Sequence, residues 1–268
     1  MIANITIGQY YPADSTVHAL DPRLKLLAVL VYIASLFVAK GPANYVIAAI
    51  CLGAVVAISG VPIKFIVKGI KGILFLMLFT AGLHIFFTTG DTLLFSAWFI
   101  KIYLEGVTTA LLMGSRLILL VMASSVLTLT TSPLELADAL ERVLKPFKRI
   151  GLPAHEIAMM MTIALRFIPT LIEEMDKIMK AQTARGADFD TGGLVKKAKS
   201  LIPLLVPLFI SSFRRADDLA MAMEARCYRG DINRTRMNTL KMSRTDFWAM
   251  GVLALYLGII IVVRIFFE

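Results

Sequence analysis

The sequence has few charged residues and few of the side chains that ligate metals. Only 18% of its 268 residues are charged, whereas 58% are hydrophobic, and the mean hydropathy is +0.77. Ordinary globular chains hold about 25% charged residues, so this composition argues against a soluble enzyme. The two cysteines, Cys51 and Cys227, have neither disulfide nor metal-ligand spacing, and the three histidines are scattered.

The sequence also lacks the common motifs of nucleotide binding and catalysis. No Gly-Lys pair occurs in it, so it has no P-loop, and any ATP must be bound by another polypeptide. His155-Glu156 begins like a zinc-protease helix, but Met159 stands where the second histidine is required. No G-x-S-x-G elbow is present. We therefore expect no catalytic residue, no metal site and no cofactor bound by this chain.

Long hydrophobic runs are abundant, by contrast. A membrane-spanning helix needs about 20 mostly apolar residues, and the candidate runs lie at about residues 24–39, 45–61, 69–88, 106–129 and 247–267. They predict an all-α integral membrane protein with about five transmembrane helices. A further apolar run, Thr92 to Leu104, predicts either a short interfacial helix or a sixth partial span.

The charged residues are concentrated in one segment. Residues 131–246 contain 19 of the 28 Lys and Arg and 14 of the 19 Asp and Glu. We therefore expect an N-terminal membrane domain of about four spans (1–130), a charged domain (131–246) and a C-terminal transmembrane helix (247–268). Because the acids are interspersed and aromatic residues are few, the segment does not predict nucleic-acid binding.

Loop charges predict the orientation in the membrane. Basic residues precede the first run and separate the second from the third, whereas the alternate loops are sparse or mixed. Cytoplasmic loops retain Lys and Arg during insertion. The pattern therefore places the N-terminus and residues 131–246 in the cytoplasm and the C-terminus outside.

Arg116 lies near the middle of the fourth predicted span. A charge there costs at least ~2.5 kcal/mol on insertion scales and needs a partner or water. It could pair with a backbone carbonyl or a carboxylate, line a substrate pathway, or snorkel to the interface. The pathway interpretation belongs to a rival function, a self-contained secondary transporter or intramembrane enzyme. That rival predicts inverted repeats, and no convincing repeat is visible.

Three long amphipathic helices are expected within residues 131–246. A capping box, Ser132-Pro133-Leu134-Glu135, starts the first. The second covers about 154–184, and the third begins after Gly193. The last two end alike, in Ala184-Arg185-Gly186 and Ala225-Arg226-Cys227. Taken alone, this ending predicts only helix termination, with arginine facing the negative end of the helix dipole.

Methionine is also concentrated in this segment. Flexible, polarizable side chains suit a surface that repacks against different partners, although they equally fill irregular cores. The candidates for a partner surface are Met159, Met160, Met161, Met175 and Met179.

Several short motifs, taken in order, resemble one family. They are Leu20-Asp21-Pro22-Arg23-Leu24-Lys25-Leu26, Thr130-Thr131-Ser132-Pro133, Arg166-Phe167-Ile168-Pro169 and the two Ala-Arg endings. Their order and their placement relative to the spans are similar to those of the transmembrane coupling subunit of energy-coupling factor (ECF) ABC-type transporters, the T-component (EcfT/CbiQ-like). The resemblance covers nearly the full chain.

The resemblance implies a non-catalytic subunit in ATP-driven uptake of a vitamin or metal ion across the cell membrane. In this family two cytoplasmic ABC-type ATPases (EcfA and EcfA′-like) bind ATP and Mg, and a membrane S-component captures the substrate. The T-component links them, and its two Ala-Arg-Gly motifs dock into the ATPases. The S-component would contact the methionines named above.

Carried over to this sequence, the two docking motifs fall on the two helix endings. The first, Ala184, Arg185 and Gly186, matches fully. In the second, Ala225, Arg226 and Cys227, cysteine stands where the family usually has glycine. That departure calls the cap geometry into question but not the arginine, since Gly230 can still end the helix.

Overall fold

The computed structural model describes residues 10–39, 41–97, 100–187, 189, 193–230 and 242–267. The chain divides into two compact units. The membrane unit consists of Gly8–Leu140 and Leu240–Glu268, and the amphipathic unit consists of Glu141–Thr239 together with Met1–Ile7. The described residues are helical almost throughout, which confirms the predicted all-α class.

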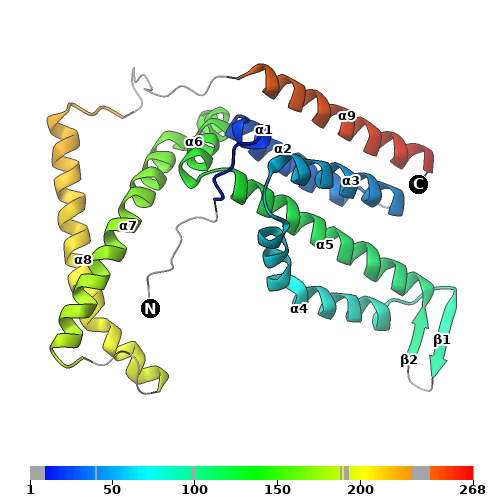
Figure 1. Ribbon diagram of the computed structural model, residues 1–268, viewed down its shortest axis with the longest axis horizontal. Coiled ribbons are helices and arrows are strands. Elements are labelled where there is room, and N and C mark those ends of the chain that lie inside the picture. Colours follow the sequence, from blue (N-terminus) through cyan, green and yellow to red (C-terminus); the bar gives the residue numbers. More distant parts are fainter. Residues whose placement is uncertain are drawn as a thin grey trace. The chain divides into compact units, whose positions relative to one another are not determined.

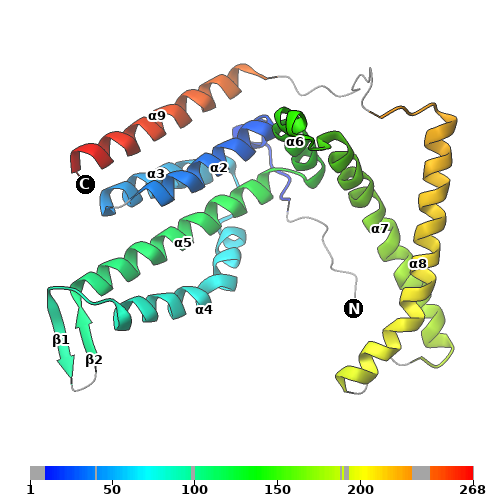
Figure 2. The same cartoon turned by 180° about the vertical axis from the view of Figure 1, so that it is seen from behind.

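The membrane unit is built mainly from long helices (Figures 1 and 2). Its helices are α1 (Thr16–Ala19), α2 (Pro22–Val38), α3 (Pro42–Ser59), α4 (Ile63–Phe87), α5 (Leu104–Thr130) and α9 (Arg244–Phe267). The central helix is α5, against which α2, α3 and α4 pack, while α9 packs against α2 and α3. Buried side chains between these helices form the core, among them Leu36, Ala48, Leu119, Ala123 and Ile260.

The helix boundaries follow local sequence signals. The Asp21 carboxylate accepts a hydrogen bond from the Arg23 amide (2.9 Å), and Pro22 occupies the first turn of α2. Pro42 likewise starts α3, which ends at Gly60 in the left-handed region. The start of α2 and both ends of α3 therefore follow from the residues at those positions.

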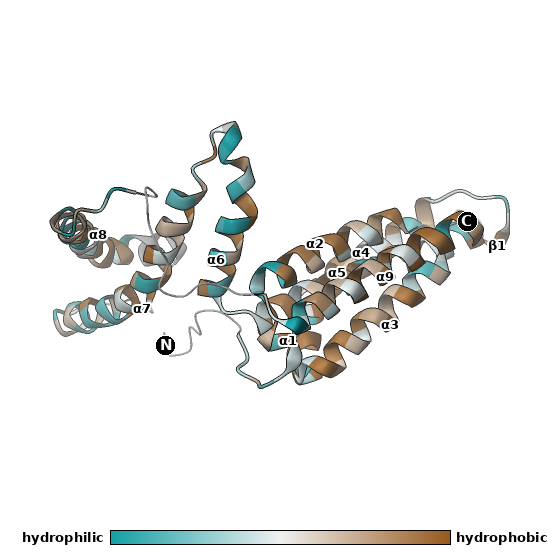
Figure 3. Cartoon of the chain, turned by 90° about the horizontal axis from the view of Figure 1, so that it is seen from above, coloured by the Kyte–Doolittle hydropathy of each residue, from teal (hydrophilic) through white to brown (hydrophobic). Residues whose placement is uncertain are grey.

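The surface of the membrane unit is strongly apolar, and Figure 3 shows hydrophobic residues along α2 to α5 and α9. Phe75, Phe87, Trp248 and Phe266 are each 78–82% exposed. Large apolar side chains exposed in this way fit contact with lipid rather than with water. The chain is a multi-pass membrane protein.

Five helices of the described residues are long and apolar enough to cross a membrane: α3, α4, α5, α7 and α9. Four of them confirm the runs predicted at 45–61, 69–88, 106–129 and 247–267. The run predicted at 24–39 is α2, which has 17 residues. The remaining candidate, α7 (Ala154–Ala184), was predicted as an amphipathic helix and also contains a sufficiently apolar stretch.

The segment from Thr92 to Leu104 is neither an interfacial helix nor a partial span, so both predictions for it are wrong. It contains β1 (Leu93–Ala97) and β2 (Ile100–Tyr103), which pair antiparallel with Ser96 opposite Lys101 and with a register shift between Leu93 and Phe95. Isoleucine and aromatic residues favour strands over helices. The cross-strand pairing satisfies those of their backbone groups that face the partner strand.

The amphipathic unit contains the remaining helices. They are α6 (Pro133–Leu144), whose last turn belongs to this unit, the 3-10 helix η1 (Lys145–Ile150), α7 (Ala154–Ala184) and α8 (Leu194–Ala225). The predicted capping box at the start of α6 is confirmed: the Glu135 amide donates to Ser132 Oγ (3.3 Å), and the Ser132 amide donates to Glu135 Oε2 (3.1 Å). Hydrophilic and hydrophobic residues alternate along α6 and α7 (Figure 3).

The two long helices of this unit, α7 and α8, run in opposite directions and pack against each other (Figures 1 and 2). A polar contact fixes their register: Glu174 on α7 accepts hydrogen bonds from Ser211 and from Arg215 Nη2 (2.9 Å) on α8. Both helices contain proline, Pro169 in α7 and Pro203 and Pro207 in α8. Each proline removes one helical hydrogen bond and favours a bend.

Candidate functional site

The first candidate site is the C-terminal end of α7. Ala184 is the last helical residue, Arg185 is the cap, and Gly186 has a φ of 88°. The Gly186 amide donates to the Thr183 carbonyl (2.9 Å), and the Ala187 amide donates to the Gln182 carbonyl (3.0 Å). These two bonds form a Schellman motif, which satisfies the last carbonyls of the helix. Glycine suits this position because φ is positive.

The second candidate site, at the end of α8, has the same backbone arrangement. The Cys227 amide donates to the Glu224 carbonyl (2.8 Å), and the Tyr228 amide donates to the Met223 carbonyl (3.0 Å). Cys227 has a φ of 54°, so a non-glycine residue occupies the left-handed position. The replacement of glycine by cysteine therefore leaves the cap geometry intact. The helix ends here and not at Gly230, which lies in a separate turn.

Both arginines are accessible. All six residues of the two endings are exposed. Within the part of the chain that the structure describes, neither the Arg185 nor the Arg226 guanidinium has a hydrogen bond or an ion pair. A guanidinium presents five donors in a planar fork that fits carboxylates bidentately. Each helix end therefore presents a charged, geometrically defined group to a partner.

A side-chain network supports the end of α8, whereas the described residues form no such network at the end of α7. The Tyr228 hydroxyl lies 3.1 Å from His155 Nε2 and 2.9 Å from Met159 Sδ at the start of α7. The other ring nitrogen of His155 lies 3.1 Å from Glu141 Oε1 in α6. Tyr228 is thus both the last residue of the Schellman motif and a link to two other helices. Sequence reasoning missed this network, whose members lie far apart in the chain.

The five methionines predicted to contact a membrane partner differ in exposure. Met160 is 59% exposed, whereas the other four are half-buried. Met159 faces Tyr228 within the amphipathic unit. Only Met160 among them offers a large free thioether surface.

The motif residues at Asp21–Lys25 and Thr130–Thr131 meet in a buried polar cluster of the membrane unit. Lys25 Nζ donates to the carbonyl oxygens of Thr130 (3.0 Å) and His18 (2.8 Å). The Asp21 amide donates to Asp246 Oδ1 (2.9 Å) at the start of α9, and Asp246 is 1% exposed. This cluster ties α2 to the ends of α5 and α9. Its members carry opposite charges and bond to backbone groups, which fits a structural role.

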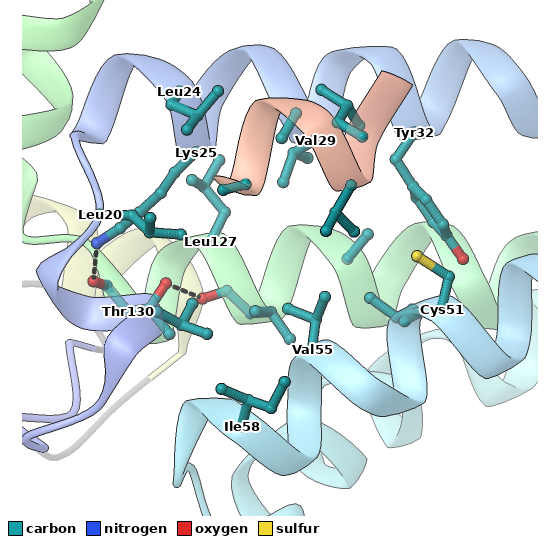
Figure 4. Close-up of a pocket in the computed structure, with 18 of the residues that line it drawn as sticks. Leu20, Leu24, Lys25, Val29, Tyr32, Cys51, Val55, Ile58, Leu127 and Thr130 are labelled. Carbon is teal, nitrogen blue, oxygen red and sulfur yellow. Dashed lines mark hydrogen bonds between the residues drawn. The ribbon is translucent and has the colours of Figure 1, made fainter. Parts of the chain in front are cut away.

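A cavity of about 460 Å³ lies beside this cluster, between α2, α3, α5 and α9. Figure 4 shows Lys25 and Thr130 at one end and Tyr32 and Cys51 at the other, with aliphatic side chains such as Val55 between them. A lining of this kind accepts hydrocarbon and not a charged solute, because polar groups lose their hydrogen bonds there. Among the described residues, no three of His, Cys, Asp and Glu could hold a metal ion.

Arg116 is held by the connection between α2 and α3. Its Nε donates to the Tyr45 hydroxyl (2.9 Å) and its Nη2 to the Ala39 carbonyl (3.5 Å), and the guanidinium lies 5.3 Å from the centroid of the Phe37 ring. The contact with the Ala39 carbonyl fits the first of the three interpretations, a structural arginine with a backbone partner. A tyrosine hydroxyl and aromatic faces complete its environment. These contacts do not support a transport pathway through Arg116.

Comparison with known proteins gives consistent matches. The model of the CbiQ family, described as cobalt transport protein, matches residues 13–238. A Clostridium kluyveri protein named energy-coupling factor transporter transmembrane protein EcfT is 56% identical over 250 residues, which cover 93% of each chain. Proteins with the same name from Ruminiclostridium cellulolyticum and Bacillus subtilis are 48% and 44% identical. The former covers both chains completely, and the latter covers 92% of this chain and 93% of its own.

Proposed function

Because the chain belongs to the CbiQ family of transport proteins, we propose that it is the energy-coupling T-component of an ECF-type ABC importer. In this role it connects two cytoplasmic ATPase subunits to an S-component that captures a vitamin or metal ion. The chain itself is non-catalytic, and the ATPases bind ATP and Mg. The name EcfT, shared by relatives that align along almost the whole chain, supports this assignment.

The observation that carries the proposal is the repeated helix end. Two long helices of one unit end in the same Schellman motif, and each places an exposed arginine at its cap. An arginine that only complements its own helix dipole needs no such repetition. Two equivalent anchors fit two related partner subunits. Bidentate, charge-assisted bonds to partner carboxylates or carbonyls would hold each end.

The geometry supports transmission of movement as well as binding. Each arginine is the cap residue itself, so a shift of the partner acts directly on the axis of the helix. The Glu174, Ser211 and Arg215 contact joins α7 to α8, so the two helices respond together. ATP binding and hydrolysis in the partners would thus become rigid-body shifts of α7 and α8. The S-component would reorient in response and release its substrate inward, with Met160 on the exposed surface of α7 as the best-placed of the five methionines.

The proposal includes an orientation in the plasma membrane. Docking to cytoplasmic ATPases requires residues 131–246 to lie in the cytoplasm together with the N-terminus, and it places the C-terminus outside. The excess of Lys and Arg in the corresponding loops supports this orientation.

Charge reversal at both helix ends tests the proposal. In an Arg185→Glu, Arg226→Glu chain, co-purification of the ATPases in mild detergent should be lost. A matched control is Lys180→Glu with Arg214→Glu, which reverses one exposed cation on the body of each helix. Normal co-purification by the first variant, or equal loss in both, would contradict the proposal.

A further inference from the structure

We propose that the turn formed by the end of α6 and η1 binds the phosphate of an anionic phospholipid. A second cavity lies here, of about 520 Å³, and its lining consists of Arg142, Lys145, Pro146 and Arg149. Three of these four residues are cations. Guanidinium and ammonium groups together bind a phosphate group through charge-assisted hydrogen bonds.

These cations come from two consecutive elements. Arg142 lies in the last turn of α6, whereas Lys145, Pro146 and Arg149 lie in η1, and all four line the same cavity. Lys145 and Arg149 are exposed, and no described residue forms an ion pair with either. The nearest acidic residue along the chain is Glu141, and its Oε1 lies 3.1 Å from Nδ1 of His155. Within the part of the chain that the structure describes, the charges of Lys145 and Arg149 are therefore not cancelled by an ion pair.

A hydrophobic side chain stands within the same turn. Phe147 is 50% exposed although it is flanked by cations. An amphipathic helix with basic residues on one face and large apolar residues on the other typically lies in the membrane interface. The position along the chain agrees, because α6 begins at Pro133 and the spanning helix α5 ends at Thr130.

The combination of charge and apolar surface favours a lipid over a soluble anion. Free phosphate would use the cations but would leave Phe147 in water, whereas a phospholipid supplies an anionic head and hydrocarbon in one molecule. Basic clusters close to a transmembrane helix bind anionic head groups in this way, at about 1 kcal/mol per Lys or Arg. The inference is independent of docking to ATPases, since it requires only this chain and lipid.

The test uses the purified full chain in detergent, titrated with phosphatidylglycerol or phosphatidylcholine, with bound lipids counted by native mass spectrometry. We expect preferential binding of phosphatidylglycerol. A Lys145→Gln, Arg149→Gln variant should bind it about 30-fold more weakly. Exchange of the two cations, Lys145→Arg with Arg149→Lys, should preserve binding, as should the control Lys180→Gln with Arg214→Gln on α7 and α8.

Two further measurements distinguish binding of a phospholipid from binding of free phosphate. An excess of inorganic phosphate should leave phosphatidylglycerol bound, and Phe147→Ser should weaken its binding. Unchanged binding in the double Gln variant, or equal loss in the α7 and α8 control, would overturn the proposal. Complete displacement by inorganic phosphate would overturn the assignment to lipid. Because no ATPase is present, these outcomes leave the proposed coupling function untouched.

Discussion

The two ends of α7 and α8 share one backbone arrangement but are stabilised in different ways. At α7 the left-handed position is Gly186, and the next residue, Ala187, has a short side chain. At α8 the left-handed position is Cys227, and the next residue, Tyr228, reaches His155 and Met159. The first end is held by local backbone preference. At the second end the backbone adopts a less favourable conformation, and the tertiary contact of Tyr228 accompanies it.

This comparison shows that the hydrogen-bond pattern, and not glycine itself, defines the ending. A left-handed non-glycine residue costs roughly 1–2 kcal/mol, whereas the Schellman motif satisfies two carbonyls that would otherwise need water. The contact of the Tyr228 hydroxyl with His155 and Met159 stabilises this end by about 1 kcal/mol, which offsets part of that cost. The arginine keeps the same cap position in both helices, which is the property that a repeated docking site requires.

The largest effect is expected from the arginines. Arg185→Ala and Arg226→Ala should each weaken ATPase binding about 30-fold, because truncation of an anchor of this kind costs 2 kcal/mol or more. Equilibrium binding of the separate ATPases to each single variant measures this effect. If only one substitution weakens binding, the two helix ends are not equivalent and the comparison fails.

The next largest effect is expected at the glycine of the α7 end. Gly186→Val should destabilise the last turn by about 2 kcal/mol, since a β-branched residue is strained at positive φ. No neighbouring atom lies within 4 Å of the added Cβ, so backbone conformation alone would be responsible. Amide hydrogen exchange at Ala187 should accelerate accordingly. Gly193→Val is the matched control, because Gly193 has a φ of −70° and equally open surroundings.

A smaller effect is expected from the tether of the α8 end. Tyr228→Phe removes the hydroxyl that contacts His155 and Met159 and should cost about 1 kcal/mol. Hydrogen exchange at the Cys227 and Tyr228 amides should rise, while exchange at Ala187 stays constant. In a double-mutant cycle with His155→Phe, the effect of Tyr228→Phe should shrink. Strict additivity would show that the contact does not stabilise this end.

The smallest effect is expected from conversion of the second ending into a copy of the first. Cys227→Gly removes the left-handed penalty but adds backbone entropy to the unfolded chain. The net result should be a gain of about 0.5–1 kcal/mol, with unchanged ATPase binding. The thermal unfolding midpoint measures the gain, and a decrease would indicate that Cys227 makes a stabilising contact of its own.

Much of the fold could be predicted because it depends on local sequence signals. Long apolar runs predicted α3, α4, α5 and α9, and the capping residues Ser132 and Glu135 predicted the start of α6. The hairpin of β1 and β2 could not be predicted in this way. Its sequence is apolar on both faces, and a short apolar run gives no period that distinguishes a strand from a helix.

The residues around the candidate site were predictable only where they follow one another in the chain. The two endings are contiguous triplets, so a repeated pattern identified them. His155 and Tyr228 are separated by 73 positions, and Asp21 and Asp246 by 225. Nothing in a single sequence pairs such residues. The altered cap geometry expected at Cys227 is not observed. The reason is energetic, because the penalty for one left-handed cysteine is smaller than the cost of an uncapped helix.

Because α7 and α8 run in opposite directions, the amphipathic unit sets the distance between the two arginines. The end of α8 lies beside the start of α7, as the contact between Tyr228 and His155 requires, so the two arginines stand at opposite ends of α7. A helix of 31 residues is about 46 Å long. Deletion of one turn from α7 would shorten the distance between the two arginines by about 5 Å. Both arginines could then be engaged at once only by two ATPases whose docking sites have the matching separation.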